Sequence, residues 1–120
     1  MAEEIALEIT EETDTAIVAF KSPSMSDVDG LANASDEIKQ FIDKKQPRRL
    51  LFDFEGVKFF SSQVLGLLLD IRARLLKHNG KVVISAINPQ LHRVFKITNL
   101  DKVFEFFPDR ESAIKTKSTD

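Results

Sequence analysis

Hydrophobic and polar residues alternate near the start of the chain and then give way to longer apolar runs. Residues 5–10 (IALEIT) alternate as a half-buried strand does, and residues 15–20 (TAIVAF) follow an acidic turn. These two segments are expected to form a hairpin. Residues 21–30 are dense in Ser, Asp, Pro and Gly, which predicts a loop with a Ser or Asp that caps the next helix.

Helical periodicity appears after this loop. Apolar residues between about positions 31 and 44 recur every three or four residues, and Pro47 ends the helix. Residues 62–80 form the second predicted helix, with Asn79 and Gly80 as its stop. Its first half is apolar on nearly every side, so we expect that half to be buried all round or to meet a partner.

The third predicted helix covers residues 88–100. Asn88 is its expected N-cap, and Pro89 suits the first helical turn. Its inward face is predicted to hold Leu91, Val94 and Phe95, with Ile97 as a further candidate.

Three more segments are predicted strands, and the chain closes with a short helix. Residues 48–60 are almost continuously apolar, with a turn at Gly56, and residues 81–87 are similar. Such runs are typical of strands buried on both faces under covering helices. Residues 103–107 are expected to form an edge strand, and residues 108–117 the final helix.

The order of these elements predicts the fold class. After the hairpin, strands alternate with helices, and right-handed crossovers would make neighbouring strands parallel. We therefore expect an α/β fold: one domain over residues 1–120, with a small mixed sheet of about five strands and helices packed mainly on one side. Residues 117–120 are expected to fray.

Composition narrows the possible functions. The chain of 120 residues has a formal charge of −2, with both signs spread along it, so it has no basic footprint for nucleic acid. It lacks cysteine, a basic leader and any apolar run near the ~20 residues that span a bilayer, so we expect a cytoplasmic protein without direct membrane insertion. Ten phenylalanines without tyrosine or tryptophan indicate a core used for packing.

Few residues could carry out catalysis. His78 lies beside a helix stop, where a capping role is expected, and His92 lies at the boundary of an apolar helix face. Neither belongs to a cluster with metal-ligand spacing, and phosphate-binding glycine loops are absent. Asp53 and Glu55 are predicted to share one face of a strand, where one of them more often organises a loop than performs acid–base work. We therefore predict no enzyme activity, no cofactor and no metal.

Adjacent serines stand where the third predicted strand meets the second helix. Ser61 or Ser62 could cap that helix by accepting a backbone N–H, which is worth about 1 kcal/mol relative to alanine. The same position, beyond the carboxyl ends of parallel strands, would also expose a hydroxyl to another protein. Phosphorylation there would add charge that a helix N-terminus tolerates, while it would disrupt an apolar binding surface.

The second half of the chain resembles a known family. The segment LLFDFEGVKFFSSQVLGLLLDIRARLLKHNGKVVISAINPQLHRVFKITNLDKVFEFF, residues 50–107, resembles the STAS domain of bacterial anti-sigma-factor antagonists. That family reads as an apolar strand with Asp, then DSSGLGxLL, a helix, a strand and SPxVxRxLxxTGLDxLF. Asp53 matches the strand aspartate, Leu65–Gly66 match the LG, and residues 88–104 match the last block almost position by position.

The resemblance implies a regulatory function. In such antagonists the first serine of DSSG is phosphorylated by an anti-sigma factor that is a serine kinase, which places the phosphorylation site at Ser62, with Ser61 as the alternative. In this chain Ser61 replaces the acidic residue, Gln63 the second serine and Val64 the glycine. The partner-binding surface implied by the resemblance consists of Asp53, Phe60, Ser61, Ser62, Gln63, Val64, Leu65 and Gly66.

The resemblance therefore predicts a non-enzymatic anti-sigma-factor antagonist. It would bind a kinase-type anti-sigma factor, release a sigma factor and be switched off by phosphorylation. The alternative is a STAS module that never meets a kinase and serves as a transporter subunit or a scaffold in a signalling complex. The altered SSQV sequence favours this alternative somewhat. A weak homodimer also stays open.

Overall fold

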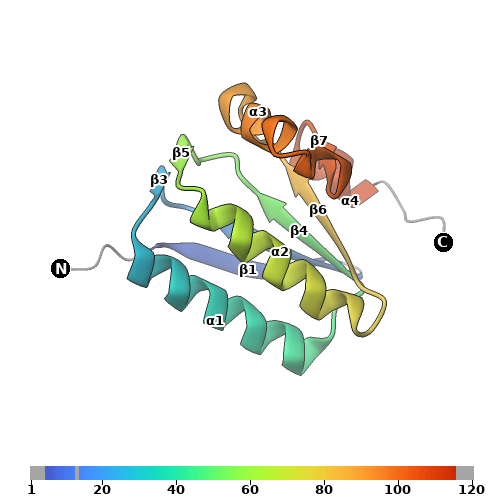
Figure 1. Ribbon diagram of the computed structural model, residues 1–120. Helices are drawn as coiled ribbons and strands as arrows, with labels where there is room; N and C mark the ends of the chain where they lie inside the picture. The colour runs from blue at the N-terminus through green and yellow to red at the C-terminus, as the bar shows by residue number, and fades with distance from the viewer. Residues whose placement is uncertain (1–4, 13, 116–120) are drawn as a thin grey trace.

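The fold is built on a five-stranded mixed sheet in the order β1-β2-β4-β6-β7 (Figure 1). The structure is a computed structural model that describes residues 5–12 and 14–115. The strands of the sheet are β1 (Leu7–Glu12), β2 (Thr15–Phe20), β4 (Arg49–Asp53), β6 (Lys81–Ser85) and β7 (Glu105–Phe107). This architecture confirms the predicted α/β class.

The sheet joins one hairpin to a parallel array. β1 pairs antiparallel with β2, which confirms the predicted hairpin, while β2, β4, β6 and β7 are parallel to their neighbours. β4 lies at the centre, and all five of its residues are buried. Its near-continuous apolar sequence is therefore explained by cover on both faces.

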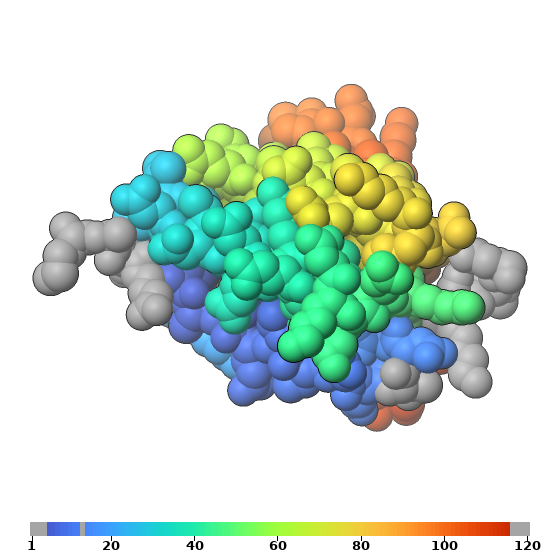
Figure 2. Space-filling model, turned by 90° about the horizontal axis from the view of Figure 1, so that it is seen from below, coloured from blue at the N-terminus to red at the C-terminus, as the bar shows by residue number. Residues whose placement is uncertain are grey.

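Helices cover the two faces unequally. The helices are α1 (Val28–Lys45), α2 (Gln63–Leu76), α3 (Pro89–Ile97), the 3₁₀ turn η1 (Leu100–Lys102) and α4 (Arg110–Lys115). The long helices α1 and α2 lie side by side, as the view from below shows (Figure 2). Together with α3 they cover the larger core, and the short α4 covers the other face of the sheet.

Phenylalanine rings form a chain through the larger core. Phe20 stacks on Phe52 with ring centroids 5.6 Å apart, and Phe20 also meets Phe54 edge-on at 5.3 Å. The chain continues from Phe54 to Phe60 at 5.9 Å and from Phe60 to Phe95 at 6.1 Å. Such edge-on pairs need no polar partner, which explains how the core uses phenylalanine in place of tyrosine and tryptophan.

Two arginines attach α4 to the second face. Arg49, 8% exposed, donates to the carbonyl oxygen of Ala113 and lies over the ring of Phe107. Burial lowers the pKa of Arg49, and the charge of Glu105 opposes that effect. At the other end of the helix, Arg110 forms a 2.8 Å ion pair with the buried Asp53. A helix of six residues is thereby held at both ends.

A cap at the start of α4 adds to this attachment. The backbone N–H of Ser112 donates to Oδ1 of Asp109 at 2.7 Å. Hydrogen bonds from the Ser112 backbone and side chain lower the pKa of the Asp109 carboxyl. The cap is thus strongest when Asp109 is ionised.

Several caps agree with the sequence prediction. Asp27 accepts from the N–H of Gly30 at 2.8 Å, within the segment predicted to cap the first helix. Asn88 accepts from the N–H of Leu91 at 2.9 Å and begins α3 as expected. The Asn88 amide also donates to the carbonyl oxygen of Val57 at 3.2 Å, so one side chain joins two segments.

Other details correct the sequence prediction. α1 begins at Val28, earlier than Leu31, and α2 ends at Leu76, with Asn79 in the left-handed region at φ 64°. Ile97 is 73% exposed and does not belong to the inward face of α3, because it lies on the solvent side near the C-terminus of that helix. The expected fraying of residues 117–120 lies outside the described residues.

The loop before α1 and the segment before α2 differ most from the prediction. Residues within each form a short strand, β3 (Ser24–Met25) and β5 (Phe59–Phe60), and these two strands pair in parallel as a separate small sheet. Two-residue strands show no hydrophobic period, so the sequence pattern could not reveal them.

The double role of Asn88 predicts a graded loss of stability. Asn88→Asp keeps the cap and removes the donor to Val57, so unfolding free energy should fall by about 1 kcal/mol. Asn88→Ala removes both bonds and should cost about 2 kcal/mol. Urea denaturation of the two variants measures the difference, and equal losses would contradict the bridging role.

The attachment of α4 predicts unequal effects of two charge removals. Arg110→Gln leaves the buried Asp53 carboxylate without its cation and should lower unfolding free energy by about 1–3 kcal/mol. The control Lys115→Gln removes an exposed pair with Glu111 and should cost less than about 0.5 kcal/mol. Comparable losses of stability in thermal denaturation would show that the buried Asp53 pair contributes no more to stability than the exposed pair.

Candidate functional site

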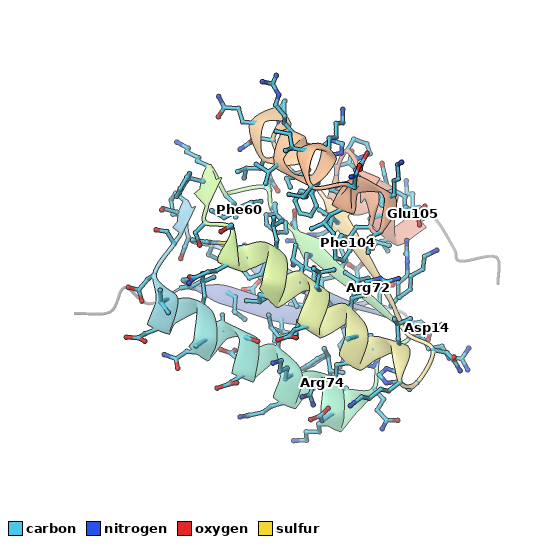
Figure 3. All side chains as sticks on the ribbon, in the orientation of Figure 1. Asp14, Phe60, Arg72, Arg74, Phe104 and Glu105 are labelled. Carbon is cyan, nitrogen blue, oxygen red and sulfur yellow. The ribbon has the colours of Figure 1, made fainter. Side chains whose placement is uncertain are left out.

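The small sheet β3–β5 holds the segment that leads into α2. The N–H groups of Lys58 and Phe59 donate to the carbonyl oxygen of Pro23 at 2.7 and 3.0 Å. The N–H of Ser61 donates to the carbonyl oxygen of Met25 at 3.1 Å. Phe60, the second residue of β5, is buried and joins the aromatic chain, near the first turn of α2 (Figure 3). The serine segment is therefore held by backbone hydrogen bonds to the loop before α1 and by the packing of Phe60 in the core.

The two serines have different surroundings. Oγ of Ser61 is buried and has no hydrogen-bond partner among the described residues, while the Ser62 side chain is exposed. Ser62 stands at the N-cap position of α2 in a helical backbone conformation, and its side chain makes no capping bond. An accessible hydroxyl and an inaccessible one are thus adjacent.

The capping role expected for these hydroxyls is wrong. Backbone carbonyls take that role instead, because the N–H groups of Val64 and Leu65 donate to the carbonyl oxygens of Ser61 and Ser62 at 3.0 and 3.1 Å. The helical backbone angles of Ser62 (φ −59°, ψ −19°) differ from the extended conformation that a capping serine usually has. The hydroxyl of Ser62 is therefore exposed and makes no bond to the helix backbone.

The remaining predicted binding residues divide between surface and core. Gln63 and Gly66 are exposed, whereas Val64 and Leu65 are at most 7% exposed and belong to the larger core. The apolar start of α2 is therefore buried mainly by its own fold. Sequence periodicity could not separate these cases, because nearly every position in this turn is apolar or small.

The exposed apolar side chains on either side of Ser62 in the sequence belong to residues outside the predicted binding set. Phe59, outside the predicted set, is 55% exposed, and Leu69 on α2 is 37% exposed. Adjacent residues of a strand face opposite sides, which explains why Phe59 is exposed while Phe60 is buried. Two adjacent phenylalanines show no alternation in the sequence, so the pattern could not distinguish them.

Gly66 leaves open space at the surface of α2. A Cβ added there would meet no atom within 4 Å, so the fold does not require glycine at this position. Residues four apart lie on one helix face, which places Gly66 one turn along from Ser62. A shallow, side-chain-free area therefore adjoins the exposed hydroxyl.

The buried carboxylate of Asp53 forms hydrogen bonds and an ion pair with three neighbouring segments. It is 2% exposed, and its Oδ1 accepts from the N–H of Glu55 at 3.2 Å and from the hydroxyl of Ser85 at 3.3 Å. Oδ2 holds Arg110. Glu55 lies in an exposed turn after β4 has ended, so the expectation that both carboxylates share a strand face is wrong. Asp53 fixes the turn that precedes the serines.

Neither histidine forms part of a reactive cluster in the part of the chain that the structure describes. Nε2 of His78 lies 2.9 Å from the carbonyl oxygen of Pro47, in agreement with a role at the helix end. His92 lies against Phe106, with ring centroids 4.3 Å apart. Within residues 5–12 and 14–115, no group of three or more His, Cys, Asp or Glu side chains could hold a metal ion.

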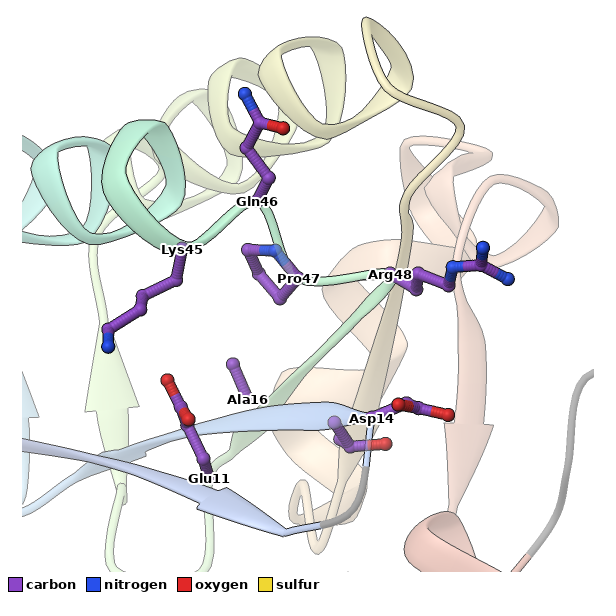
Figure 4. Close-up of a pocket in the computed structure, with 8 residues that line it drawn as sticks. Glu11, Asp14, Ala16, Lys45, Gln46, Pro47 and Arg48 are labelled. Carbon is purple, nitrogen blue, oxygen red and sulfur yellow. The ribbon is translucent and has the colours of Figure 1, made fainter.

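Hollows on the surface lie away from the serines. One of about 230 Å³ lies between the β1–β2 hairpin and the end of α1, where Glu11, Asp14, Lys45 and Arg48 surround it (Figure 4). Its charges are balanced, and the charged groups belong to exposed side chains. It offers no arrangement of convergent groups for catalysis.

Solved structures of other proteins share this fold. An anti-sigma factor antagonist from Mycobacterium paratuberculosis is similar with a TM-score of 0.80 and 22% identity, and the match covers 92% of each chain. The anti-sigma factor antagonist SpoIIAA in its unphosphorylated form gives a TM-score of 0.72 at 16% identity, covering 91% of this chain and 94% of that one. A sulfate transporter family protein from Wolinella succinogenes gives 0.70 at 12% identity, covering 87% and 84%.

In the described part of the chain, every helix is too short or too polar to span a bilayer.

The family is identified from the sequence, while the solved structures show the shared fold. A family model described as STAS domain matches residues 6–113, nearly the whole chain. The protein therefore belongs to the STAS domain family.

Proposed function

We propose that this STAS domain is an anti-sigma-factor antagonist that acts by binding, without catalysing a reaction. In its unmodified form it binds a serine-kinase-type anti-sigma factor and thereby releases a sigma factor. The surface consists of Ser62, Gln63 and Gly66 with the flanking apolar groups Phe59 and Leu69. Similarity to proteins described as anti-sigma factor antagonists supports this assignment.

The exposed hydroxyl of Ser62, beside the buried hydroxyl of Ser61, carries the proposal. A kinase must bring the acceptor oxygen into line with the γ-phosphoryl group of ATP, which requires access from solvent. Ser62 meets this requirement and Ser61 does not. The alternative modification site at Ser61 is therefore not favoured.

Phosphorylation of Ser62 would act through the negative charge that it adds to the surface. The Ser62 oxygen forms the new bond to phosphorus, the bond from phosphorus to the β–γ bridging oxygen breaks, ADP leaves and the hydroxyl proton passes to a base of the kinase. The product carries about −1.5 to −2 charge at neutral pH, at the positive end of α2, where the fold tolerates it. The partner could no longer desolvate Phe59 and Leu69 beside that charge, so the complex would dissociate.

A transporter-associated module is the second candidate. The similarity to a sulfate transporter family protein and the SSQV sequence at the serines favour it. In that case the domain would act as a subunit or scaffold, and no kinase would modify Ser62. Co-purification from the source organism separates the two functions, since a membrane transporter would be recovered in place of an anti-sigma factor.

Substitutions at Ser62 test the proposed switch. Ser62→Asp should weaken binding to the cognate anti-sigma factor by at least about tenfold because of like-charge and desolvation costs. Its unfolding free energy should change by less than about 0.5 kcal/mol, since the side chain is exposed and caps nothing. Isothermal titration calorimetry with each purified kinase-type anti-sigma factor of the source genome measures the binding.

The adjacent serine provides the control for modification. Incubation with the kinase and ATP should add one phosphate to the protein and to Ser61→Ala, and none to Ser62→Ala, as read by intact-mass spectrometry. An unchanged mass in the unsubstituted protein would remove the switch and favour the transporter-associated function.

Gly66 tests whether the open area beside Ser62 belongs to the binding surface. Gly66→Ala should raise unfolding free energy by about 1 kcal/mol, because alanine is the better helix former and its Cβ has free space. Gly66→Leu, whose Cβ also meets no atom within 4 Å, should block close approach and weaken anti-sigma-factor binding by at least about tenfold. Unchanged affinity in the leucine variant would place Gly66 outside the surface.

A further inference from the structure

The two flanks of α2 differ in how their charges are matched. On the flank toward α1, Arg74 pairs with Asp43 at 2.8 Å, and Asp70 pairs with Lys39 at 3.3 Å. On the flank away from α1, Arg72 forms no ion pair or hydrogen bond with any residue from 5 to 12 or 14 to 115. The charged side chains on the flank toward α1 are therefore paired, whereas the arginine on the opposite flank is unpaired among the described residues.

Exposed leucines share the unmatched flank. Spacings of three and four residues place Leu69, Arg72 and Leu76 on one face of α2. Leu69 is 37% exposed and Leu76 is 51% exposed. A cation between two exposed leucines forms an amphipathic stripe that the fold itself does not cover.

A hollow of about 380 Å³ adjoins the C-terminal end of this stripe. It lies between the second half of α2 and the segment from η1 to β7, over the start of β6. Val82 and Phe104, both nearly buried, form the apolar floor, and Leu76 and Val103 line the sides. Figure 3 shows Arg72, Phe104 and Glu105 in this part of the molecule. The hollow can accept one large apolar side chain.

The rim of the hollow is positive. Arg72, Lys81, Lys102 and Glu105 surround it, and Lys81 and Glu105 pair with each other at 3.3 Å. Lys102, like Arg72, has no ion-pair partner in the described part of the chain, so two cations remain uncompensated. The whole protein carries a formal charge of −2, so the local sign is opposite to that of the molecule.

We propose that this hollow is a second docking site, which binds an acidic segment of a partner protein. One large apolar side chain of that segment fills the space between Leu76 and Phe104. Carboxylates on either side of it pair with Arg72 and Lys102, and the arginine can hold a carboxylate through two parallel hydrogen bonds. The site lies at the start of β6, whereas Ser62 lies beyond the strands' carboxyl ends, so docking here does not depend on phosphorylation.

Other occupants fit the observations less well. A small polar ligand would need several convergent polar groups, and the floor is apolar. A nucleic acid would need a wider basic surface than two cations. An acidic peptide with one apolar anchor matches both the charge and the floor.

The proposal can be tested with the whole chain and synthetic peptides. The probes are three peptides of seven residues in which Leu, Phe or Met stands among Asp and Glu residues. Addition to the ¹⁵N-labelled protein should shift the amide signals of Arg72, Leu76, Lys102 and Val103. Matched peptides with Lys in place of the acidic residues, or Ala in place of the anchor, should shift them far less.

A charge-reversal pair provides the decisive comparison. Arg72→Glu with Lys102→Glu should weaken peptide binding by at least about tenfold. The matched control, Arg93→Glu with Lys96→Glu, reverses two exposed cations of α3 outside the hollow and should leave affinity within about twofold. Leu76→Ala, which removes an exposed side chain without disturbing the core, should also weaken binding.

Four outcomes would overturn the proposal. They are the absence of shifts at the hollow at about 1 mM of every acidic peptide, equal binding of the lysine peptides, equal loss in the control variant, and shifts that depend on protein concentration alone. The last outcome would assign the hollow to a second copy of this chain.

Discussion

A strand that is buried on both faces must have both faces covered, and β4 imposes this constraint on the rest of the molecule. Its five residues are all buried at the centre of the sheet. α1 and α2 satisfy the requirement on one face through a core of phenylalanine and aliphatic side chains. On the other face, the six-residue α4 is the only helix among the described residues, and it is too short to be stable by itself. The polar attachments at its two ends are therefore needed to complete the fold.

The same constraint limits where the proposed binding surface can lie. Because β4 ends at Asp53, the carboxylate of that residue lies where the strand, the following turn, β6 and α4 meet. One buried group thus connects the far face of the sheet to the turn that precedes the serines. The proposed surface consists of groups that the core does not use: an exposed hydroxyl, an exposed glutamine, a glycine and two partly exposed apolar side chains. Buried residues of the core and exposed residues of the proposed binding surface therefore alternate within a few positions of the chain.

Sequence patterns predicted the elements whose signals are local. The caps at Asp27 and Asn88, the hairpin of β1 and β2 and the buried strands β4 and β6 each rest on residues close together in the chain. The small sheet β3–β5 depends on contact between segments more than 30 residues apart, so it leaves no periodic trace. At the site, the family resemblance pointed to Ser62, but it could not distinguish the buried hydroxyl of Ser61 from the exposed one of Ser62. Burial at such a junction depends on tertiary packing, which residue type does not specify.

The anchoring of the serine segment also bears on how fast and how tightly the proposed partner would bind. Backbone bonds to Pro23 and Met25 and the ring of Phe60 within the aromatic chain anchor this segment to the domain in the absence of a partner. A recognition loop that is already ordered loses little conformational entropy when a complex forms. Association can then proceed as the meeting of two rigid bodies, at a rate governed by diffusion and orientation with no slow rearrangement of the loop.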